Sequence, residues 1–316
     1  MGQDGPVLTV TVAHADLLTG LEARGIPTGA RVVLWDLVDP APVPVEEIDV
    51  VVVPNYFVRR EGYRALEGLP RLRVVQLPSA GIEHALPHLP AGLTVCNGRG
   101  VHDAGTAELA LALTLASQRG LDEAIGAMPE GRWQPTYRSS LADRRVLVVG
   151  AGAIGSAVAR RVEAFEAEVV RVGRSARRTS EGQVHAIDEV PALLPTVDVV
   201  ILVVPLTEET HHLVDAAFLA ALPDGALVVN VARGKVIDTQ ALLAELESGR
   251  LRAALDVTDP EPLPADHPLW RAPRTIITPH EGGYTDATTP RLVDLVGRQV
   301  DALVAGEEPV NVVART

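Results

Sequence analysis

The sequence predicts an α/β fold made of two doubly wound parallel-sheet domains, and three observations lead to this prediction. Short runs of β-branched residues alternate with segments of good helix formers along the chain, an order that gives parallel sheets covered by helices on both faces. The length of 316 residues matches two domains of ordinary size. The apolar run 146–149 leads into a turn with three glycines and then into a helical segment, as a buried parallel strand and its crossover helix would.

Composition narrows the class of protein. No stretch reaches the roughly 20 apolar residues that a membrane span needs, and the N-terminus lacks the basic and apolar regions of a signal peptide. Cys96 is the only cysteine, which excludes an internal disulfide and a cysteine-based metal cluster. The formal net charge of −13 argues against nucleic-acid binding, because phosphate contacts need a basic surface. We therefore expect a cytoplasmic protein that binds neither nucleic acid nor membrane.

The first hundred residues alternate between strand and helix patterns. Strands are predicted at 7–13, 31–35, 49–53, 72–77 and 93–96, helices at 16–24 and 59–67, and a proline-rich loop at 39–45. Ser79, Ala80 and Gly81 follow the fourth strand. They are expected at the carboxyl edge of the sheet, where open α/β folds bind their ligands.

The remaining chain repeats this alternation. Helices are predicted at 104–119, 153–164, 238–249 and 290–305, strands at 146–149, 168–172, 197–204, 226–231, 252–257 and 275–278, and connections at 131–140 and 259–273. The helix 104–119 is apolar almost all round, so we expect it to be buried on several sides. This order predicts that a domain of residues 102–283 is inserted into a domain formed by 1–101 and 284–316, both within the usual size range.

The glycine-rich turn has the spacing of a dinucleotide-binding fingerprint. Gly150, Gly152 and Gly155 form a G-x-G-x-x-G pattern between a strand and a helix. The first glycine allows the tight turn, the second lets a pyrophosphate approach the backbone, and the third lets the helix pack against the strand. Free N–H groups at the start of the helix, with Ala153 and Ile154, would then face the phosphates.

Three polar residues just past predicted strand ends form a candidate catalytic group: Arg233, Glu261 and His280. An arginine fork can bind a carboxylate and a neighbouring carbonyl oxygen. A histidine can protonate the alkoxide that forms when a hydride reaches carbon 2 of a 2-oxo acid. A glutamate can orient the imidazole and favour its protonated form. Each of the three residues alone has an ordinary structural explanation. Their occurrence together in a chain that also has a dinucleotide-binding turn favours a catalytic role.

One pair of adjacent histidines could bind a metal ion, but the rest of the sequence does not support a metal site. His211 and His212 are adjacent, but neighbouring residues point in different directions on a helix, and no third ligand is near in the sequence. We therefore predict no metal site.

Seven segments in matching order resemble the D-isomer-specific 2-hydroxyacid dehydrogenase family along almost the whole chain. They are Ser79-Ala80-Gly81-Ile82-Glu83, Asn97 with Ala107-Glu108, Gly150 to Gly155, Pro205-Leu206-Thr207 with Thr210, Asn230-Val231-Ala232-Arg233-Gly234, Leu255-Asp256-Val257 with Glu261-Pro262, and Thr278-Pro279-His280. Glu281 departs from the pattern, because a small or apolar residue is expected there.

The resemblance implies a fold, a homodimer and roles for individual residues. A Rossmann-type dinucleotide domain would be inserted into a flavodoxin-like substrate domain, and the long helix 104–119 would help form the homodimer. Arg233, Glu261 and His280 would be catalytic. Substrate would be bound by Ser79, Ala80, Gly81, Arg233 and His280. With the glycine motif and the basic loop described next, the cofactor-binding set is Thr106, Gly150, Gly152, Ala153, Ile154, Gly155, Arg174, Ser175, Arg177, Pro205, Thr210, Val231, Ala232, Asp256 and His280.

The loop after the second strand of the inserted domain indicates which nicotinamide is used. An acidic residue normally binds the adenosine ribose there, but Gly173 stands in its place, followed by Arg174, Ser175, Arg177 and Arg178. Guanidinium groups and a hydroxyl suit a 2′-phosphate, and NADP-using members of the family carry a similar Arg-Ser pair. NADPH is therefore favoured, with NAD also possible.

The sequence as a whole predicts a reductase of small 2-oxo acids, of the glyoxylate or hydroxypyruvate type. Two alternatives remain: the same chemistry on a larger 2-oxo acid or with NADH, and a dinucleotide-sensing binding protein without catalysis.

Overall fold

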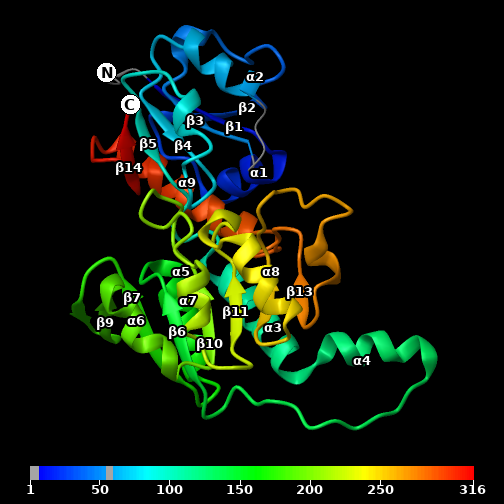
Figure 1. Ribbon diagram of the computed structural model, residues 1–316. Helices are drawn as coiled ribbons and strands as arrows, with labels where there is room; N and C mark the ends of the chain where they lie inside the picture. Colours follow the sequence, from blue (N-terminus) through cyan, green and yellow to red (C-terminus); the bar gives the residue numbers. More distant parts are fainter. Residues whose placement is uncertain (1–6, 55–59) are drawn as a thin grey trace. The chain divides into compact units, whose positions relative to one another are not determined.

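The computed structural model describes residues 7–54 and 60–316 of the chain and contains two compact units (Figure 1). The first unit comprises Met1–His102 and Thr285–Thr316, and the second comprises Asp103–Tyr284.

The first unit contains a six-stranded sheet in the order β14-β5-β4-β3-β1-β2. Its strands are β1 (Leu8–Val12), β2 (Ala30–Leu34), β3 (Val50–Val52), β4 (Val74–Gln76), β5 (Thr94–Cys96) and β14 (Val312–Arg315). The first five are parallel and follow the flavodoxin-like order 2-1-3-4-5. The antiparallel edge strand β14 was not predicted, because its short run at the chain terminus is largely exposed.

Helices cover both faces of this sheet. α1 (Ala15–Arg24) and α9 (Thr288–Val304) pack against one face, with Leu17, Leu21 and Leu295 in the shared core. α2 (Arg60–Arg64) and the turn of 3₁₀ helix after it lie on the other face. The predicted helix at 59–67 is thus divided in two, and its first residue lies outside the described residues.

The second unit contains an eight-stranded sheet in the order β13-β12-β11-β10-β6-β7-β9-β8. Its strands are β6 (Arg145–Val149), β7 (Glu168–Gly173), β8 (Arg177–Thr179), β9 (Gly182–Ala186), β10 (Val199–Leu202), β11 (Leu227–Asn230), β12 (Arg252–Leu255) and β13 (Thr275–Ile277). The six strands from β9 to β12 are parallel and have the dinucleotide-binding order 3-2-1-4-5-6. β13 continues this parallel sheet, whereas β8 is antiparallel to β9.

The central strands are buried on both faces, which explains their continuous apolar sequence. Val146 and Val148 belong to one core, shared with α3 (Asp103–Arg119) and α5 (Ala153–Glu163). Leu147 and Val149 alternate to the other face. There they pack with residues of α6 (Val190–Leu193), α7 (Ala216–Ala220) and α8 (Thr239–Glu247). This doubly wound arrangement confirms the predicted fold class.

Two elements of the second unit differ from the prediction. α4 (Leu121–Ala127) follows α3 and projects from the unit with the connection after it (Figure 1). Its residues are almost all exposed, so it lacks the apolar stripe that identifies a helix. The basic loop after β7 continues into the hairpin β8–β9, in which β8 is exposed throughout and β9 buries only Val184 fully, so neither strand has an alternating apolar face.

Among the described residues, no helix has both the length and the apolar character that a membrane crossing requires.

Candidate active site

The glycine-rich turn between β6 and α5 is built for close contact. At Gly155 a Cβ atom would stand 1.7 Å from the carbonyl oxygen of Gly150, so only glycine lets the helix pack here. At Gly152, the N-cap of α5, a Cβ would meet nothing within 4 Å. The space over Gly152 and the free N–H groups of the first helical turn, with Ala153 and Ile154, fit a dinucleotide pyrophosphate.

The end of β7 lies beside this turn. Arg177 donates to the carbonyl oxygen of Ala151 at 3.1 Å and to that of Ser175 at 3.3 Å. A Cβ atom on Gly173 would stand 2.9 Å from Nη1 of Arg177. Arg177 thus connects the glycine turn to the loop after β7, and a cavity of about 220 Å³ opens beside them. Arg174 turns outward and pairs with Glu209 at 2.8 Å.

Side chains fix the turns after β10 and β11. The hydroxyl of Thr210 donates to the carbonyl oxygen of Pro205 at 2.6 Å and accepts from the N–H of Thr207 at 2.8 Å. Asn230 accepts from the N–H of Ala232 and donates to the carbonyl oxygen of Arg233, each at 3.0 Å. The amide of Asn230 therefore sets the backbone that presents Arg233, a role that the sequence analysis had not assigned to it.

The loop that carries Arg233 packs directly on the loop after β12. A Cβ atom at Gly234 would stand 1.9 Å from the carbonyl oxygen of Thr258. This contact leaves room only for glycine and holds the two loops together. It brings Arg233 close enough to Glu261 for the guanidinium charge to act on that carboxylate.

Glu261 and His280 form a hydrogen-bonded pair, with Oε1 2.6 Å from Nδ1. Both side chains are about one-third exposed. Burial acts to raise the pKa of Glu261. The hydrogen bond and charge of His280, the N–H of Thr258 and the charge of Arg233 outweigh burial, so the pKa of Glu261 lies below its ordinary value. Because Nδ1 faces the carboxylate, Nε2 is the ring nitrogen left to meet a substrate.

Asp256 anchors the loop that presents His280. The residue is 3% exposed. Its carboxylate accepts from the hydroxyl of Thr278 at 2.6 Å and from the N–H groups of Glu281 at 2.8 Å and Gly282 at 3.0 Å. His280 itself has a φ of 56°, a left-handed conformation that costs energy for a residue with a side chain and is often found at functional sites.

The remaining residues of the predicted set lie at the same edge of the sheet. Thr106 of α3 donates to the carbonyl oxygen of Gly282 at 3.3 Å. Val231 and Ala232, directly after β11, are buried. The second unit thus brings Arg233, Glu261 and His280 together at the carboxyl edge that also carries the glycine turn. The contributions of Asn230, Thr258 and Glu209 were not predicted from the sequence. Of the three, only Asn230 belongs to a segment that the sequence singles out, Asn-Val-Ala-Arg-Gly.

In the first unit, the loop 79–81 has its carbonyl groups tied down. Gly98 donates its N–H to the carbonyl oxygen of Ser79, Asn97 donates to that of Ala80, and the hydroxyl of Ser79 donates to that of Gly81, each at 2.7 Å. The N–H groups of Ala80 and Gly81 donate no hydrogen bond to any described residue. Fixed backbone with unused donors is suited to hold an anion such as a carboxylate.

Residues 111–282 match the family model described as D-isomer specific 2-hydroxyacid dehydrogenase, NAD binding domain. The chain belongs to this family. A glyoxylate reductase from Korarchaeum cryptofilum is 33% identical over 258 residues, which are 78% of this chain and 77% of the relative.

Two solved structures are similar to this chain over nearly its whole length. A D-isomer specific 2-hydroxyacid dehydrogenase from Xanthobacter autotrophicus Py2, in complex with NADPH and MES, has a TM-score of 0.82 at 27% identity, covering 98% of this chain and 99% of that one. An NADPH-dependent glyoxylate/hydroxypyruvate reductase from Sinorhizobium meliloti, in complex with NADP and sulfate, has a TM-score of 0.80 at 25% identity, covering 98% of both.

Proposed function

We propose that the protein reduces a small 2-oxo acid of the glyoxylate or hydroxypyruvate type to the D-2-hydroxy acid, with hydride from NADPH. The hydrogen-bonded pair of Glu261 and His280, on the sheet edge that also holds Arg233 and the glycine turn, carries this proposal. The names of the relatives support the substrate class.

In this reaction, residues of the chain bind the substrate and transfer a proton to it. Arg233 binds the substrate carboxylate and polarises the carbonyl at carbon 2. When bound, the reduced nicotinamide supplies a hydride that adds to this carbon, and the electron pair of the C=O bond moves to its oxygen. Nε2 of His280 gives that oxygen its proton. Glu261 holds the imidazole by Nδ1 and compensates its positive charge.

We assign the two roles of substrate and cofactor binding to the two parts of the chain. Residues 1–101 and 284–316 would bind substrate, through Ser79 and the unused N–H groups of Ala80 and Gly81. Residues 102–283 would bind the dinucleotide, through the glycine turn and the turns at 174–177, 205–210 and 231–232, with Thr106, Asp256 and His280 near the nicotinamide. The match of 111–282 to an NAD binding domain supports the second assignment.

The position of Arg177 supports NADPH over NADH. Its guanidinium group bridges Ala151 of the glycine turn and Ser175, and no carboxylate stands at Gly173 to bind the ribose or to repel a 2′-phosphate. Arg177 and Ser175 would bind the 2′-phosphate directly. Arg174 would join them after leaving Glu209, its partner in an exposed pair that contributes little energy.

We also propose a cytoplasmic homodimer. The chain has a single, buried cysteine, as is usual in a reducing compartment. The segment from α4, which Gly120 separates from α3, to Tyr137 exposes four large apolar side chains: Ile125, Met128, Trp133 and Tyr137, with Trp133 94% exposed. Such a run of large apolar side chains indicates a protein contact, and a second copy would cover it. Sedimentation of the double variant Ile125→Asp with Met128→Asp should show monomers where the wild type shows dimers.

The function is tested with a panel of 2-oxo acids assayed with both reduced nicotinamides. We expect the highest kcat/KM for glyoxylate or hydroxypyruvate with NADPH, and a D-configured product from hydroxypyruvate. A higher kcat/KM for a long or branched 2-oxo acid would contradict the substrate class. Tight NADPH binding with no turnover of any 2-oxo acid would instead indicate a dinucleotide-sensing protein.

A further inference from the structure

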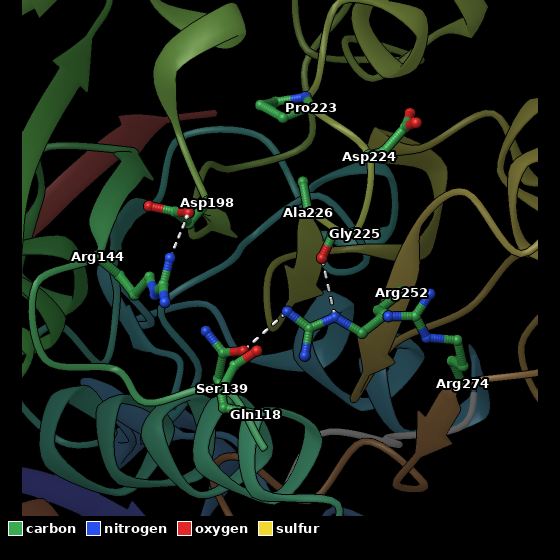
Figure 2. Close-up of a pocket in the computed structure, with 10 residues that line it drawn as sticks. All are labelled: Gln118, Ser139, Arg144, Asp198, Pro223, Asp224, Gly225, Ala226, Arg252 and Arg274. Carbon is green, nitrogen blue, oxygen red and sulfur yellow. Dashed lines mark hydrogen bonds and ion pairs between the residues drawn. The ribbon is translucent and has the colours of Figure 1, made fainter. Parts of the chain in front are cut away.

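The second unit has a cavity at the amino ends of its parallel strands, whereas the candidate catalytic residues follow the carboxyl ends. It lies where five neighbouring strands begin, from β6 across to β13, and measures about 200 Å³. We call it the arginine cavity. Its lining residues are Gln118, Ser139, Arg144, Asp198, Pro223, Asp224, Gly225, Ala226, Arg252 and Arg274 (Figure 2).

Arg252 at the start of β12 forms the centre of this lining. The residue is only 9% exposed. It donates to the carbonyl oxygen of Gly225 at 3.0 Å, to that of Ser117 at 3.3 Å and to Oε1 of Gln118 at 2.8 Å. These bonds use three of the five N–H groups of a guanidinium, and every acceptor is uncharged. No carboxylate of the described chain forms an ion pair with Arg252.

The other charges of the lining compensate this cation only in part. Arg144 and Arg274 add two positive groups. Asp198 is engaged by Arg144 at 3.3 Å and by the N–H of Arg145 at 2.9 Å. Asp224 has an 88% exposed side chain, and its carboxylate points away from Arg252 (Figure 2). Burial, followed by the charges of Arg274 and Arg144, lowers the pKa of Arg252, and the opposing charge of Asp198 does not reverse this shift.

A buried positive charge is costly unless an anion compensates it. We propose that the arginine cavity binds a small free oxyanion, of which inorganic phosphate is the simplest example. The donors are the two remaining N–H groups of Arg252 and the N–H groups of Arg274 other than the one that donates to the carbonyl oxygen of Gly249 at 3.0 Å. Guanidinium forks are suited to oxyanions. A cavity of about 200 Å³ holds several waters at about 30 Å³ each, and therefore a four-oxygen anion.

This site is separate from the proposed dinucleotide site. The glycine turn follows the last residue of β6, whereas Arg144 precedes the first residue of the same strand. The two sites therefore lie at opposite ends of the parallel strands. A carboxylate side chain from a second copy is the rival occupant. The burial of Arg252, which is 9% exposed as a residue, favours a free ion, because a small diffusing anion reaches a buried residue more easily than a tethered side chain does.

The test is calorimetric titration of the full chain with inorganic phosphate at constant ionic strength, with and without saturating NADPH. We expect saturable binding of one phosphate per chain that persists with NADPH bound. Arg274→Gln should weaken the Kd at least about tenfold, and Arg252→Lys, which keeps the charge but loses the fork, should weaken it as well. Arg271→Gln is the matched control, an exposed arginine three residues away outside the cavity, and should leave the Kd unchanged.

Three results would overturn the proposal. The first is that phosphate does not bind. The second is that phosphate binding disappears when NADPH is bound, which would place the phosphate at the dinucleotide site. The third is that Arg274→Gln leaves the Kd for phosphate unchanged. Loss of the dimer in Arg274→Gln, with no phosphate binding to the wild type, would assign the cavity to a carboxylate of the second copy.

Discussion

Nδ1 of His280 lies 2.6 Å from Oε1 of Glu261, although 19 positions separate the two residues and they follow different strands, β12 and β13. The loops that carry them are fixed by separate contacts, one through Gly234 and Thr258 and the other through Asp256. The pair is therefore set by the fold before any ligand binds, as efficient proton transfer requires.

Glu261→Gln should change the pH dependence of the reaction in opposite ways for its two directions. The substitution removes a negative charge from beside the imidazole and thereby disfavours its protonated form. Reduction needs that form, so its alkaline limb in kcat/KM should move to lower pH. Oxidation of the 2-hydroxy acid needs the neutral form and should gain relative activity at low pH.

A second carboxylate–imidazole pair provides the control for this variant. Oε2 of Glu189 lies 2.8 Å from Nδ1 of His185 on the surface of the same unit. Glu189→Gln should leave both pH–rate profiles in place. If the limbs of Glu261→Gln coincide with those of the wild type, Glu261 does not act on the proton donor.

The same carboxylate should affect stability in acid. Because the pKa of Glu261 is lowered in the folded chain, its ionisation contributes stability above the unfolded value of about 4.3. That contribution is lost as the pH falls through the lower folded value. The Tm difference between wild type and Glu261→Gln should therefore be largest above about pH 5 and shrink as the pH falls below about 4. A difference that grows in acid would contradict the direction of the shift.

Arg233→Lys should keep the charge but lose the planar fork that binds a carboxylate and a carbonyl together. The loss of one well-placed donor typically costs about 2.7–4 kcal/mol of transition-state stabilisation. We therefore expect kcat/KM to fall by two to three powers of ten, while NADPH binding measured by fluorescence changes little. Near-normal turnover would remove Arg233 from the proposed mechanism.

Gly234→Ala should damage both stability and catalysis. The new methyl group would stand 1.9 Å from the carbonyl oxygen of Thr258, so the loops that carry Arg233 and Glu261 must separate. Overpacking of this kind typically costs about 1–3 kcal/mol, and kcat should fall with the Tm. Gly68→Ala is the control, because a Cβ atom there meets nothing within 4 Å and the backbone is outside the left-handed region, so both the Tm and kcat should change little.

The sequence predicted those elements in which burial or close packing restricts the residue types. It did not predict elements whose residues are mostly exposed. The buried strand 146–149 and the three glycines predicted β6, its turn and α5, because burial and close packing allow few alternatives. α4 and the hairpin β8–β9 were missed, since α4 and β8 are exposed and β9 buries only Val184 fully, which leaves no apolar period to recognise. The roles of Asn230 and Asp256 depend on contacts with loop backbone, which a sequence does not display.

The choice of nicotinamide should depend on Arg177 more than on its neighbours. We expect the wild type to prefer NADPH at least about tenfold in kcat/KM, equivalent to about 1.4 kcal/mol. Arg177→Gln should reduce this preference by raising KM for NADPH, because the guanidinium that bridges Ala151 and Ser175 would bind the 2′-phosphate. KM for NADH, which has no such phosphate, should change little.

Arg178→Gln is the matched control for this prediction. Arg178 is the next residue of the exposed strand β8, so its side chain points to the opposite face and away from the glycine turn.

Gly173→Asp with Arg174→Ala should shift the preference further, toward NADH, because the new carboxylate can bind the ribose hydroxyls and repels a 2′-phosphate. It would also stand beside Arg177, since the Cβ position lies 2.9 Å from Nη1, and would neutralise part of that charge. A wild type that uses NADH as well as NADPH would contradict the preference, and equal effects of Arg177→Gln and Arg178→Gln would show that Arg177 does not bind the phosphate.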